Sequence, residues 1–406
     1  MGEAAMDDYE VVIIGAGICG LATALALHKK GIKSVVMEKS DALRNITGAA
    51  IGIRQNGWRA LEQLGVADVL RGAAISIQRE RIVGLDGGKL QEMSIIGENR
   101  CLRRKDLIDT LYAALPPATV KFGCELESIK LDPNTTKPVL QFIGGSYIIP
   151  KVVIGCDGGK SVIADFLNLK PTKMFPLCVV RGISNYPNGH TFDREFARFK
   201  KDNYLVGIIP IDDNLVFWFL ARPYVPRDER IWEDPEAIRR STLKLLGDYP
   251  QEVKEMIEIA DAKSLSFTRI RYRAPWDLLR GTFCKGRVTV AGDAMHVMGP
   301  FLGQGGAAGL EDAVVLARDL AEMGLDQDAV VLARNLARMG LNRVEEALSL
   351  YVKERRMRVV RVSLQAYLIG MLLGSSSNLK RLILSMLLYL LFRNPGGHTD
   401  YDCGAL

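Results

Sequence analysis

The first forty residues alternate between apolar runs and a helical pattern. Val11–Ile14 is an unbroken apolar run, which is typical of a strand that is buried on both faces. A helical pattern follows through residues 21–30, and Gly31 stands where a glycine commonly ends a helix. Ser34–Met37 is a second apolar run, and Glu38 closes it. The pattern therefore predicts a strand–helix–strand unit at the start of the chain.

The turn between the first strand and the helix is rich in glycine and reads GAGICG. In such a turn Gly15 permits a sharp bend, Gly17 lets a pyrophosphate approach the backbone, and Gly20 lets the helix pack closely on the strand. The helix N-terminus, which includes Ile18, offers free N–H groups and the positive end of a dipole. Glu38 can accept hydrogen bonds from ribose hydroxyls. These parts in this order predict a site for the ADP half of a dinucleotide, and a glycine-rich turn without a ligand is the alternative.

Mixed helical and strand patterns continue to about residue 175. The predicted elements are helices near Trp58–Leu64 and Arg103–Leu115 and strands at Val120–Phe122, Glu125–Leu131, Val139–Phe142 and from Val152. The last of these strands runs into Asp157-Gly158. This alternation of buried strands and helices is typical of an α/β sheet with ligand-binding turns at its edge.

The pattern of apolar and polar residues changes between about residues 176 and 275. Apolar and polar residues alternate at 194–200, 204–210 and 214–221, which predicts antiparallel strands of a second lobe. Helical patterns follow Pro235 and Pro250, and another strand is predicted near Ser264–Arg271. From Arg287 the pattern returns to a buried strand, which leads into AGDAMHVMGPFLGQGG at 291–306.

The remaining C-terminal part is mostly helical. Residues 312–325 recur almost unchanged at 328–341, which indicates a tandem duplication that lengthens or doubles one helix. The helical region 344–373 carries a run of arginines, for which we expect a solvated helix face. Residues 382–392 are apolar but too few to span a bilayer, so they predict a buried helix, with a weak contact to a membrane surface as the alternative. The arginines are Arg355, Arg356, Arg358 and Arg361.

Composition narrows the class of protein. The net charge is only +6 over 406 residues and the basic residues are dispersed, so a nucleic-acid partner is not expected. The seven cysteines form no CxxC pair, which argues against a disulfide framework and a metal site and favours a reducing compartment. The N-terminus shows no signal or transit pattern, and we expect a cytoplasmic protein without a transmembrane segment.

The stretch 291–306 contains Asp293 and His296, whose spacing would place them on one face of a helix. A catalytic pair is one reading, but the context favours another. The stretch follows a predicted strand, as do GAGICG and Asp157-Gly158, and strand ends of one sheet meet at one edge. A long ligand such as FAD, with its ADP half at 15–38 and its flavin near 300, accounts for all these turns.

These motifs together resemble the single-component (group A) FAD-dependent aromatic-ring hydroxylases. The chain is most similar to the plant subfamily related to salicylate hydroxylase and zeaxanthin epoxidase. The motifs are GAGICG (15–20), Arg104–Leu107–Leu111, DGGKS (157–161) and GDAMHVMGPFLGQGG with LEDA (292–313). The resemblance implies a Rossmann-like FAD-binding domain, an antiparallel β-sheet substrate domain of α+β type and a C-terminal helical region. The corresponding ranges are 1–175 and 276–345 for the FAD-binding domain (with the repeat at 312–341), 176–275 for the substrate domain and 346–406 for the C-terminal helices.

The resemblance also implies roles by position. Glu38 would hold the adenosine ribose, Arg104 the pyrophosphate and Asp293 the ribityl chain. Asp157 and Gly158 would lie near the pyrophosphate. No catalytic side chain is assigned, and Pro300 and Gly303 are candidates for the loop beside the flavin. The other candidates for cofactor binding are Gly15, Gly17, Ile18, Lys39, Leu126, Gly305 and Gly306.

The implied activity is a FAD- and NAD(P)H-dependent monooxygenase that inserts one oxygen atom of O2 into an aromatic or phenolic small molecule through a flavin C4a-hydroperoxide. NAD(P)H would visit a groove, because no second dinucleotide fingerprint is present. Arg54, Tyr204, Phe217 and Trp218 are candidates for the substrate pocket, although Phe217 and Trp218 face opposite ways on a strand. Epoxidation of an apolar alkene and a flavoprotein that binds partners without turnover are the alternatives. The oligomeric state is not assigned.

Overall fold

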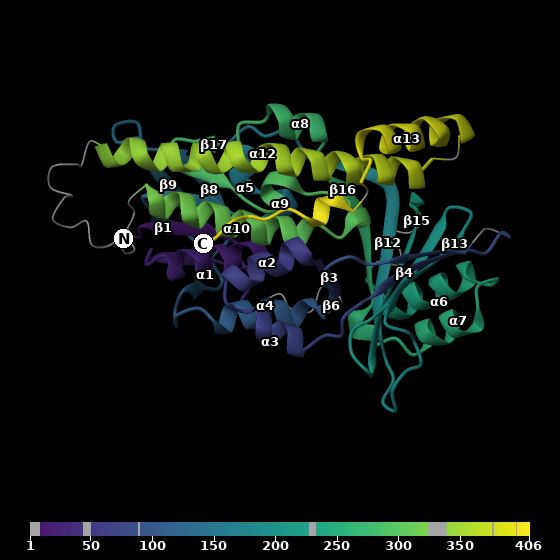
Figure 1. Cartoon of the computed structure of the whole chain (residues 1–406). Helices are drawn as coiled ribbons and strands as arrows, with labels where there is room; N and C mark the ends of the chain where they lie inside the picture. Colours follow the sequence, from purple (N-terminus) through teal and green to yellow (C-terminus); the bar gives the residue numbers. More distant parts are fainter. Residues whose placement is uncertain are drawn as a thin grey trace.

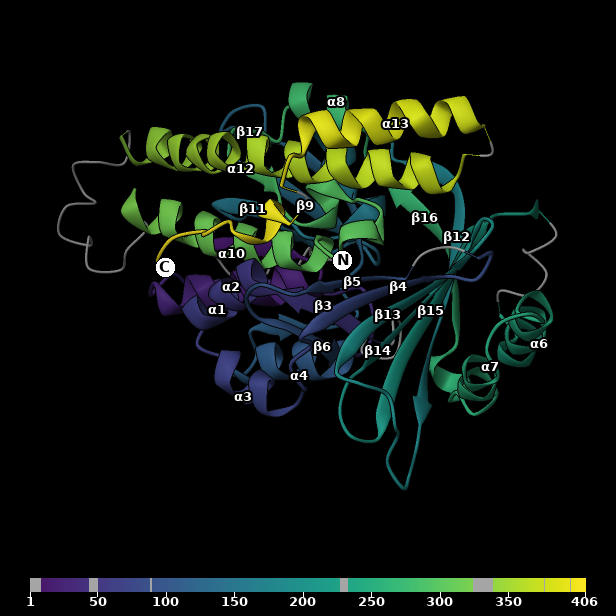
Figure 2. The same cartoon turned by 45° about the vertical axis from the view of Figure 1, so that its right-hand side comes forward.

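The computed structural model describes residues 9–43, 50–87, 90–226, 233–323, 339–375, 377–394 and 396–406. These residues form two lobes that lie side by side, with one long helix running along both (Figures 1 and 2). Sheets and helices alternate in the first lobe, and a broad twisted sheet forms the second. The predicted α/β class, with a second lobe of α+β type, is confirmed.

A mostly parallel sheet forms the centre of the first lobe, with the strand order β17-β18-β11-β1-β2-β7. The strands are β1 (Val11–Ile14), β2 (Ser34–Met37), β7 (Val120–Lys121), β11 (Val152–Gly155), β17 (Cys284–Lys285) and β18 (Val288–Val290). All neighbours pair in parallel except β17 with β18. Every residue of β1 and β11 is buried, which explains their unbroken apolar sequences.

Helix α1 (Ile18–Lys29) lies within the core of this lobe. All its residues from Gly20 to Leu27 are buried, so the helix is apolar around its whole circumference. It packs against α10 (Gly305–Glu322), which also contacts α2 (Gln55–Gln63) and α12 (Met339–Leu373). The predicted strand–helix–strand unit is confirmed as β1–α1–β2.

Two smaller sheets complete the first lobe. They are the three-stranded β8 (Leu126–Leu131), β9 (Pro138–Phe142) and β10 (Tyr147–Ile148), and the antiparallel pair β3 (Ala50–Arg54) and β6 (Asn99–Arg103). Helix α4 (Arg104–Ala113) begins directly after β6. Helix α5 (Val162–Phe166) follows β11, and its N-cap Ser161 accepts a hydrogen bond from the N–H of Ala164.

A seven-stranded sheet forms the second lobe, with the order β16-β12-β15-β14-β13-β4-β5. The strands are β4 (Arg79–Gly84), β5 (Gln91–Ser94), β12 (Lys173–Asn185), β13 (Glu195–Lys201), β14 (Tyr204–Pro210), β15 (Leu215–Pro223) and β16 (Ser266–Tyr272). The antiparallel pairing predicted for this region is present from β13 to β16. Strands β4 and β5 also join the sheet, although they lie within the range 1–175 that the sequence assigned to the first lobe.

Helices α6 (Pro235–Leu245) and α7 (Gln251–Glu258) cover one face of this sheet (Figure 2). Their apolar residues form one core with every second residue of β13, β14 and β15. The opposite face of the sheet points towards the first lobe, where Phe217 packs with Cys101 of β6. This face is therefore the one that can contribute to a site between the lobes.

The C-terminal helices run along the outside of the molecule. Helix α12 spans both lobes, and both α8 (Pro275–Arg280) and α13 (Asn378–Leu391) pack on it (Figure 1). The prediction of a buried helix at 382–392 is wrong in one respect, because the helix forms but none of its residues is buried. Among the described residues no helix is long and apolar enough to cross a membrane. The second copy of the repeat, 328–341, falls largely outside the described residues.

Candidate active site

Four sequence motifs meet at the carboxyl edge of the parallel sheet. Strands β18, β11, β1 and β2 are consecutive neighbours, and each ends in one of the predicted turns. The turns begin at Gly292, Cys156, Gly15 and Glu38. They also touch, because a Cβ added to Gly15 would lie 2.7 Å from the carbonyl oxygen of Cys156. The predicted meeting of these segments at one edge is therefore present in the structure.

The GAGICG turn has the geometry that its glycines predict. Gly15 has a φ of +102°, which a residue with a side chain rarely adopts. A Cβ on Gly20 would lie 1.9 Å from the carbonyl oxygen of Gly15, so helix and turn can approach only with glycine here. A Cβ on Gly17 would meet nothing within 4 Å, and no side chain caps the α1 N-terminus. The turn thus leaves open space in front of the free N–H groups that begin with Ile18.

Glu38 lies at the end of β2 and points back to this turn. Its Oε2 accepts a hydrogen bond of 2.8 Å from the N–H of Ala16, and its Oε1 accepts one of 3.0 Å from Ser40. The carboxylate is therefore held beside α1, where a ribose next to the pyrophosphate would lie. Lys39 forms an exposed ion pair with Glu125, next to the buried Leu126.

Asp157 provides a buried oxygen that lacks a partner. Its Oδ2 accepts a hydrogen bond of 2.7 Å from the N–H of Val162, whereas its Oδ1 is buried without one. Burial raises the pKa of Asp157 despite the hydrogen bonds from Ser161 and from nearby N–H groups. Gly158 follows with a φ of +79° and open space where a Cβ would lie. A buried acceptor of this kind next to an open turn fits a ligand with hydroxyl or N–H donors.

Arg104 and Asp293 bring opposite charges to the same region. The Nε of Arg104 is buried without a hydrogen-bond partner, and burial lowers the pKa of this guanidinium while Asp293 raises it. Asp293 is exposed although it lies between buried residues, and no described residue donates a hydrogen bond to its carboxylate. A free cation and a free carboxylate at one edge suit a ligand that carries both phosphate and hydroxyl groups.

The loop after Asp293 leads to a second helix N-terminus. Pro300 begins a short 3-10 turn, and Gly303 ends it in the left-handed conformation with open space around it. Helix α10 then begins at Gly305, without a side-chain cap and with Asp293 Oδ1 3.8 Å from where a Cβ on Gly305 would lie. On Gly306 a Cβ would lie 2.4 Å from Ile51 Cδ1. The loop therefore ends in a second uncapped helix N-terminus, beside Asp293.

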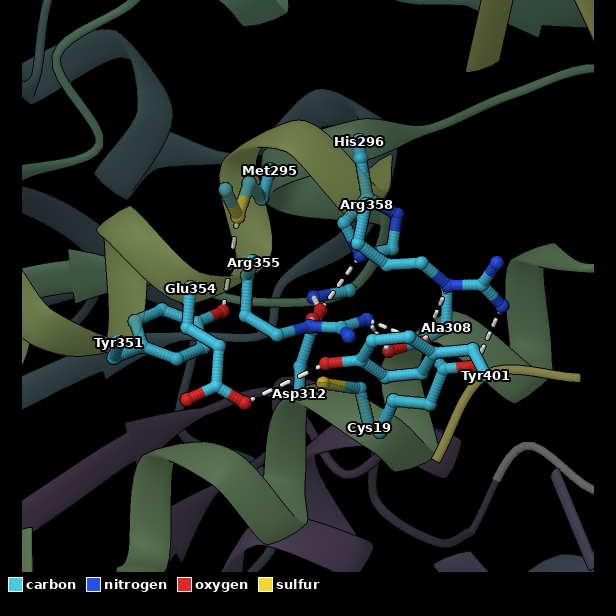
Figure 3. A network of polar contacts seen from close by, with 12 residues as sticks. Cys19, Met295, His296, Ala308, Asp312, Tyr351, Glu354, Arg355, Arg358 and Tyr401 are labelled. Carbon is cyan, nitrogen blue, oxygen red and sulfur yellow. Dashed lines mark hydrogen bonds and ion pairs between the residues drawn. The ribbon is translucent and has the colours of Figure 1, made fainter. Parts of the chain in front are cut away.

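His296 does not pair with Asp293. It is fully buried, and its Nε2 lies 2.6 Å from Oδ2 of Asp312 on α10 (Figure 3). The same carboxylate accepts hydrogen bonds from the N–H of Gly292 at 2.8 Å and from Nε of Arg355 at 2.7 Å. His296 therefore joins the loop to α10 and, through Asp312, to Arg355 of α12, which argues against a catalytic pair with Asp293.

Arg355 and its neighbours correct another prediction. Arg355 is fully buried and pairs with Asp312 (Figure 3). It also pairs with Glu311, which Arg358 binds at 2.8 Å. Burial lowers the pKa of Arg355, but the two carboxylates outweigh this and raise it well above the ordinary value. For Asp312 burial acts in the other direction and raises the pKa, but the charges of His296 and Arg355 hold it below the usual range. The expected solvated arginine face is therefore wrong for this part of the run.

The face of the second sheet that points towards the first lobe carries aromatic and basic side chains. Phe217 and Phe219 are 6.2 Å apart between ring centroids, and Phe196 lies 6.1 Å from Phe219. Arg198 lies over Phe196, with its Nε buried and unpartnered. Arg181 shares this face with Val179 and Ile183. Its pKa is lowered mainly by burial and further by the charge of Arg104.

The four predicted substrate residues separate into two groups. Phe217 lies on the face towards the first lobe, as a pocket residue should. Trp218 is fully buried against α6 and α7, and Tyr204 packs against the same core. These two residues are on the wrong face for the predicted pocket, because alternate strand residues point in opposite directions. Arg54 is bound to Glu80, which also binds Arg198.

Comparison with known proteins decides the family. A model of the FAD binding domain matches residues 8–327. Monooxygenase 1 of Arabidopsis thaliana is 47% identical over 405 residues, which cover 99% of this chain and 100% of that protein. The chain belongs to the FAD-binding-domain family. It is a FAD-dependent monooxygenase, and Monooxygenase 2 of the same plant is a further relative at 33% identity over 98% of both chains.

Solved structures share the fold of this monooxygenase. HpxO of Klebsiella pneumoniae in complex with FAD and uric acid superposes with a TM-score of 0.77 at 22% identity, covering 97% of this chain and 96% of HpxO. CtdE in complex with FAD and a substrate also gives 0.77, at 18% identity and with 98% and 96% coverage. At this identity the similarity shows only that the fold is shared. The site has to be argued from the residues of this monooxygenase.

Those residues fit FAD. The open backbone at Gly17, Gly158 and Gly303, the unpartnered Nε of Arg104 and the unpartnered Oδ1 of Asp157 are features that such a ligand would satisfy. Sequence reasoning missed Phe196, Phe219, Arg181 and Arg198. A period-two pattern was visible around the first two and Arg198, but which face meets the first lobe depends on the packing of α6 and α7.

Proposed function

We propose that this monooxygenase uses NAD(P)H and inserts one oxygen atom of O2 into an aromatic or phenolic small molecule with a negative charge. The observation that carries the proposal is the face formed by Phe196, Phe217 and Phe219, with Arg181 and Arg198 on the same side of the sheet. Aromatic rings pack against such a face, and a guanidinium binds a carboxylate or phenolate. One glutamate, Glu80, is shared by Arg54 and Arg198, so this cluster keeps a net positive charge.

The chain would hold FAD through the features described above. The N–H groups of α1 and the Arg104 guanidinium would bind the pyrophosphate, Glu38 the ribose, and Asp293 the ribityl hydroxyls. When bound, FAD supplies the redox chemistry that lets O2 donate one oxygen atom to the substrate. The uncapped N-terminus of α10 would offer N–H groups to negative charge that develops on the flavin, and the Pro300 turn would lie beside it.

The test is NAD(P)H oxidation by purified enzyme with bound FAD, measured with phenolic acids, neutral phenols, flavonoids and terpenoid alkenes. We expect stimulation by anionic aromatic compounds and a product that contains one oxygen atom from 18O2. Phe217→Leu should raise KM several-fold by loosening the pocket. Phe199→Leu, a change of the same size on the α6–α7 face, should leave KM unchanged. Protein that gains no flavin spectrum from added FAD would contradict the assignment, and equal KM changes in the two variants would contradict the pocket.

Epoxidation of an apolar alkene is the second candidate, and one observation supports it. Helix α13, which contains most of residues 382–392, exposes one stripe of its apolar side chains, which would suit an enzyme that takes its substrate from a membrane. Stimulation by terpenoid alkenes but not by phenolic acids would favour this reaction. A role as a binding module without turnover rests on the tandem repeat, whose second copy lies largely outside the described residues, and it gains no support.

A further inference from the structure

Helix α13 turns an apolar stripe towards solvent. Six of its large apolar side chains recur at helical spacing and are between 46% and 76% exposed. They are Leu379, Leu382, Ile383, Met386, Tyr389 and Leu390. A surface helix of a globular protein normally turns such a stripe to the core. Helix α13 packs on α12 (Figures 1 and 2). The exposed fractions show that the apolar stripe lies on the side turned away from this contact.

The surroundings of the stripe are basic. Between residues 362 and 399 the chain contains Lys380, Arg381 and Arg393 and no aspartate or glutamate. Lys380 is exposed in the first turn of α13, Arg381 beside it is half-buried, and Arg393 is exposed just beyond the end of the helix. Positive charges therefore lie at both ends of the apolar stripe.

A second short helix adds to this side of the molecule. Helix α8 also packs on α12, and both views place it on the same side of α12 as α13 (Figures 1 and 2). It exposes Trp276 and Leu279, which are 43% and 48% accessible, and Arg280 is exposed at its end. Tryptophan and basic residues are the side chains that favour the boundary between lipid headgroups and acyl chains.

We propose that α13 binds the surface of a membrane that contains anionic lipids. The apolar stripe would enter the boundary of the acyl chains with the helix parallel to the surface, and Lys380 and Arg393 would contact headgroup phosphates. A helix of 14 residues is about 21 Å long, too short to cross the bilayer but long enough to lie in this boundary.

The charges favour a lipid surface over a second copy of the chain. If two α13 helices packed antiparallel about a two-fold axis, Lys380 and Arg381 of one would face Arg393 of the other. The like charges would then repel, and no acidic residue between 355 and 399 could compensate them. Anionic headgroups complement the same charges, so the apolar stripe and the basic residues at its ends fit a lipid surface.

The experiment is sedimentation of the FAD-loaded enzyme with phosphatidylcholine vesicles, with and without phosphatidylserine, at low and high salt. We expect strong binding only to the vesicles that contain phosphatidylserine, weakened by salt. Leu382→Ser combined with Tyr389→Ser should reduce this binding about tenfold or more, because less apolar surface enters the membrane. Lys380→Glu combined with Arg393→Glu should abolish the preference for phosphatidylserine.

Ile96→Ser is the matched control, because Ile96 is 91% exposed but lies in the segment after β5 and not on α13. It should bind vesicles like the unchanged enzyme. Unchanged flavin absorbance and melting temperature in all variants would show that folding is intact. Absence of binding to either vesicle, or equal binding by the α13 variants, would overturn the proposal. A concentration-dependent dimer in sedimentation velocity that the α13 changes dissociate would overturn it in favour of a second copy.

Discussion

At the scale of single residues, the two polar side chains of the 291–306 loop have separate tasks. His296 is fully buried and joins Asp312, whereas Asp293 is exposed at the edge where the ligand would lie. The spacing of the two residues in sequence suggested a common role. Their contacts show that one side chain stabilises the fold of the loop and that the other is free for a ligand.

His296→Ala should therefore lower stability rather than act only on the cofactor. The change removes one partner of a buried carboxylate and leaves a cavity, which together cost about 2–4 kcal/mol. Urea unfolding of the apoprotein measures this loss. At low temperature, where the variant remains folded, its flavin content should stay close to that of the unchanged enzyme. Unchanged stability would contradict the role of His296 as a fastening between loop and helix.

Asp293→Ala is the matched change at the exposed position. It should leave the unfolding curve of the apoprotein nearly unchanged but raise the Kd for FAD about tenfold or more, because one or two hydrogen bonds to hydroxyls are lost. Quenching of flavin fluorescence measures the Kd. Glu322→Ala, at the exposed far end of α10, is the control and should bind FAD normally. An unaltered Kd for Asp293→Ala would show that Asp293 does not bind FAD.

Asp319 offers a test of pH dependence. Burial raises its pKa from 3.8 to about 6, although Arg318 lowers it. Because the folded-state pKa is raised, the folded state loses stability as pH rises from the ordinary aspartate value through 6. Asp319→Asn should thus raise stability by about 1–2 kcal/mol near pH 7.5, and the gain should shrink as pH falls from 6 towards 4. Thermal unfolding over this range checks it, and a gain that does not change with pH would contradict the raised pKa.

At the scale of elements, some helices and strands could be predicted from the sequence pattern and others could not. The β1–α1–β2 unit was predictable because its apolar runs, glycines and acid lie within one short segment. The exposure of α13 was not, because an apolar sequence normally indicates burial. The role of Arg355 was also missed, since its partners Glu311 and Asp312 lie on another helix more than forty residues earlier. Strand β5 has only exposed residues and therefore lacks the alternation that marks a strand.

The pairing of α10 with α12 depends on that buried arginine. Arg355→Ala would leave Glu311 and Asp312 buried with fewer cations, and we expect a loss of about 3–5 kcal/mol. Urea unfolding with an unchanged m value measures it. Arg361→Ala, on the same helix but exposed, should change stability by less than about 0.5 kcal/mol. If the two substitutions had equal effects, the buried network would not hold the helices together.

At the scale of the whole molecule, the site lies between the two lobes. Segments that are far apart in the sequence build each lobe. The parallel sheet provides the turns for FAD, and the second sheet provides the aromatic face. Strands β4 and β5, from the middle of the first segment, extend the second sheet, so the two lobes are joined by more than the crossings near residues 175 and 275. Ligand binding at this edge should therefore stabilise both lobes together.

Arg104 of the first lobe and Arg181 of the second are close enough for their charges to interact. Burial lowers the pKa of both guanidinium groups, and the charge of Arg104 lowers that of Arg181 further, so the two cations repel across the junction of the lobes. An anion between them would remove the repulsion. Arg181→Met should accordingly stabilise the apoprotein and reduce the stability that it gains from an anionic ligand.

The measurement is the melting temperature with and without saturating FAD, and then with an added anionic substrate. For the unchanged enzyme, FAD at about a hundred times its Kd should add about 2.7 kcal/mol of stability. If Arg181 faces the pyrophosphate, Arg181→Met should reduce the gain from FAD; if it faces the substrate, only the gain from the anionic substrate should fall. Arg240→Met, at an exposed position of α6 on the opposite face of the sheet, is the control and should leave both gains unchanged. A variant of Arg181 that matches the unchanged enzyme in all three states would show that the repulsion between the lobes has no energetic consequence.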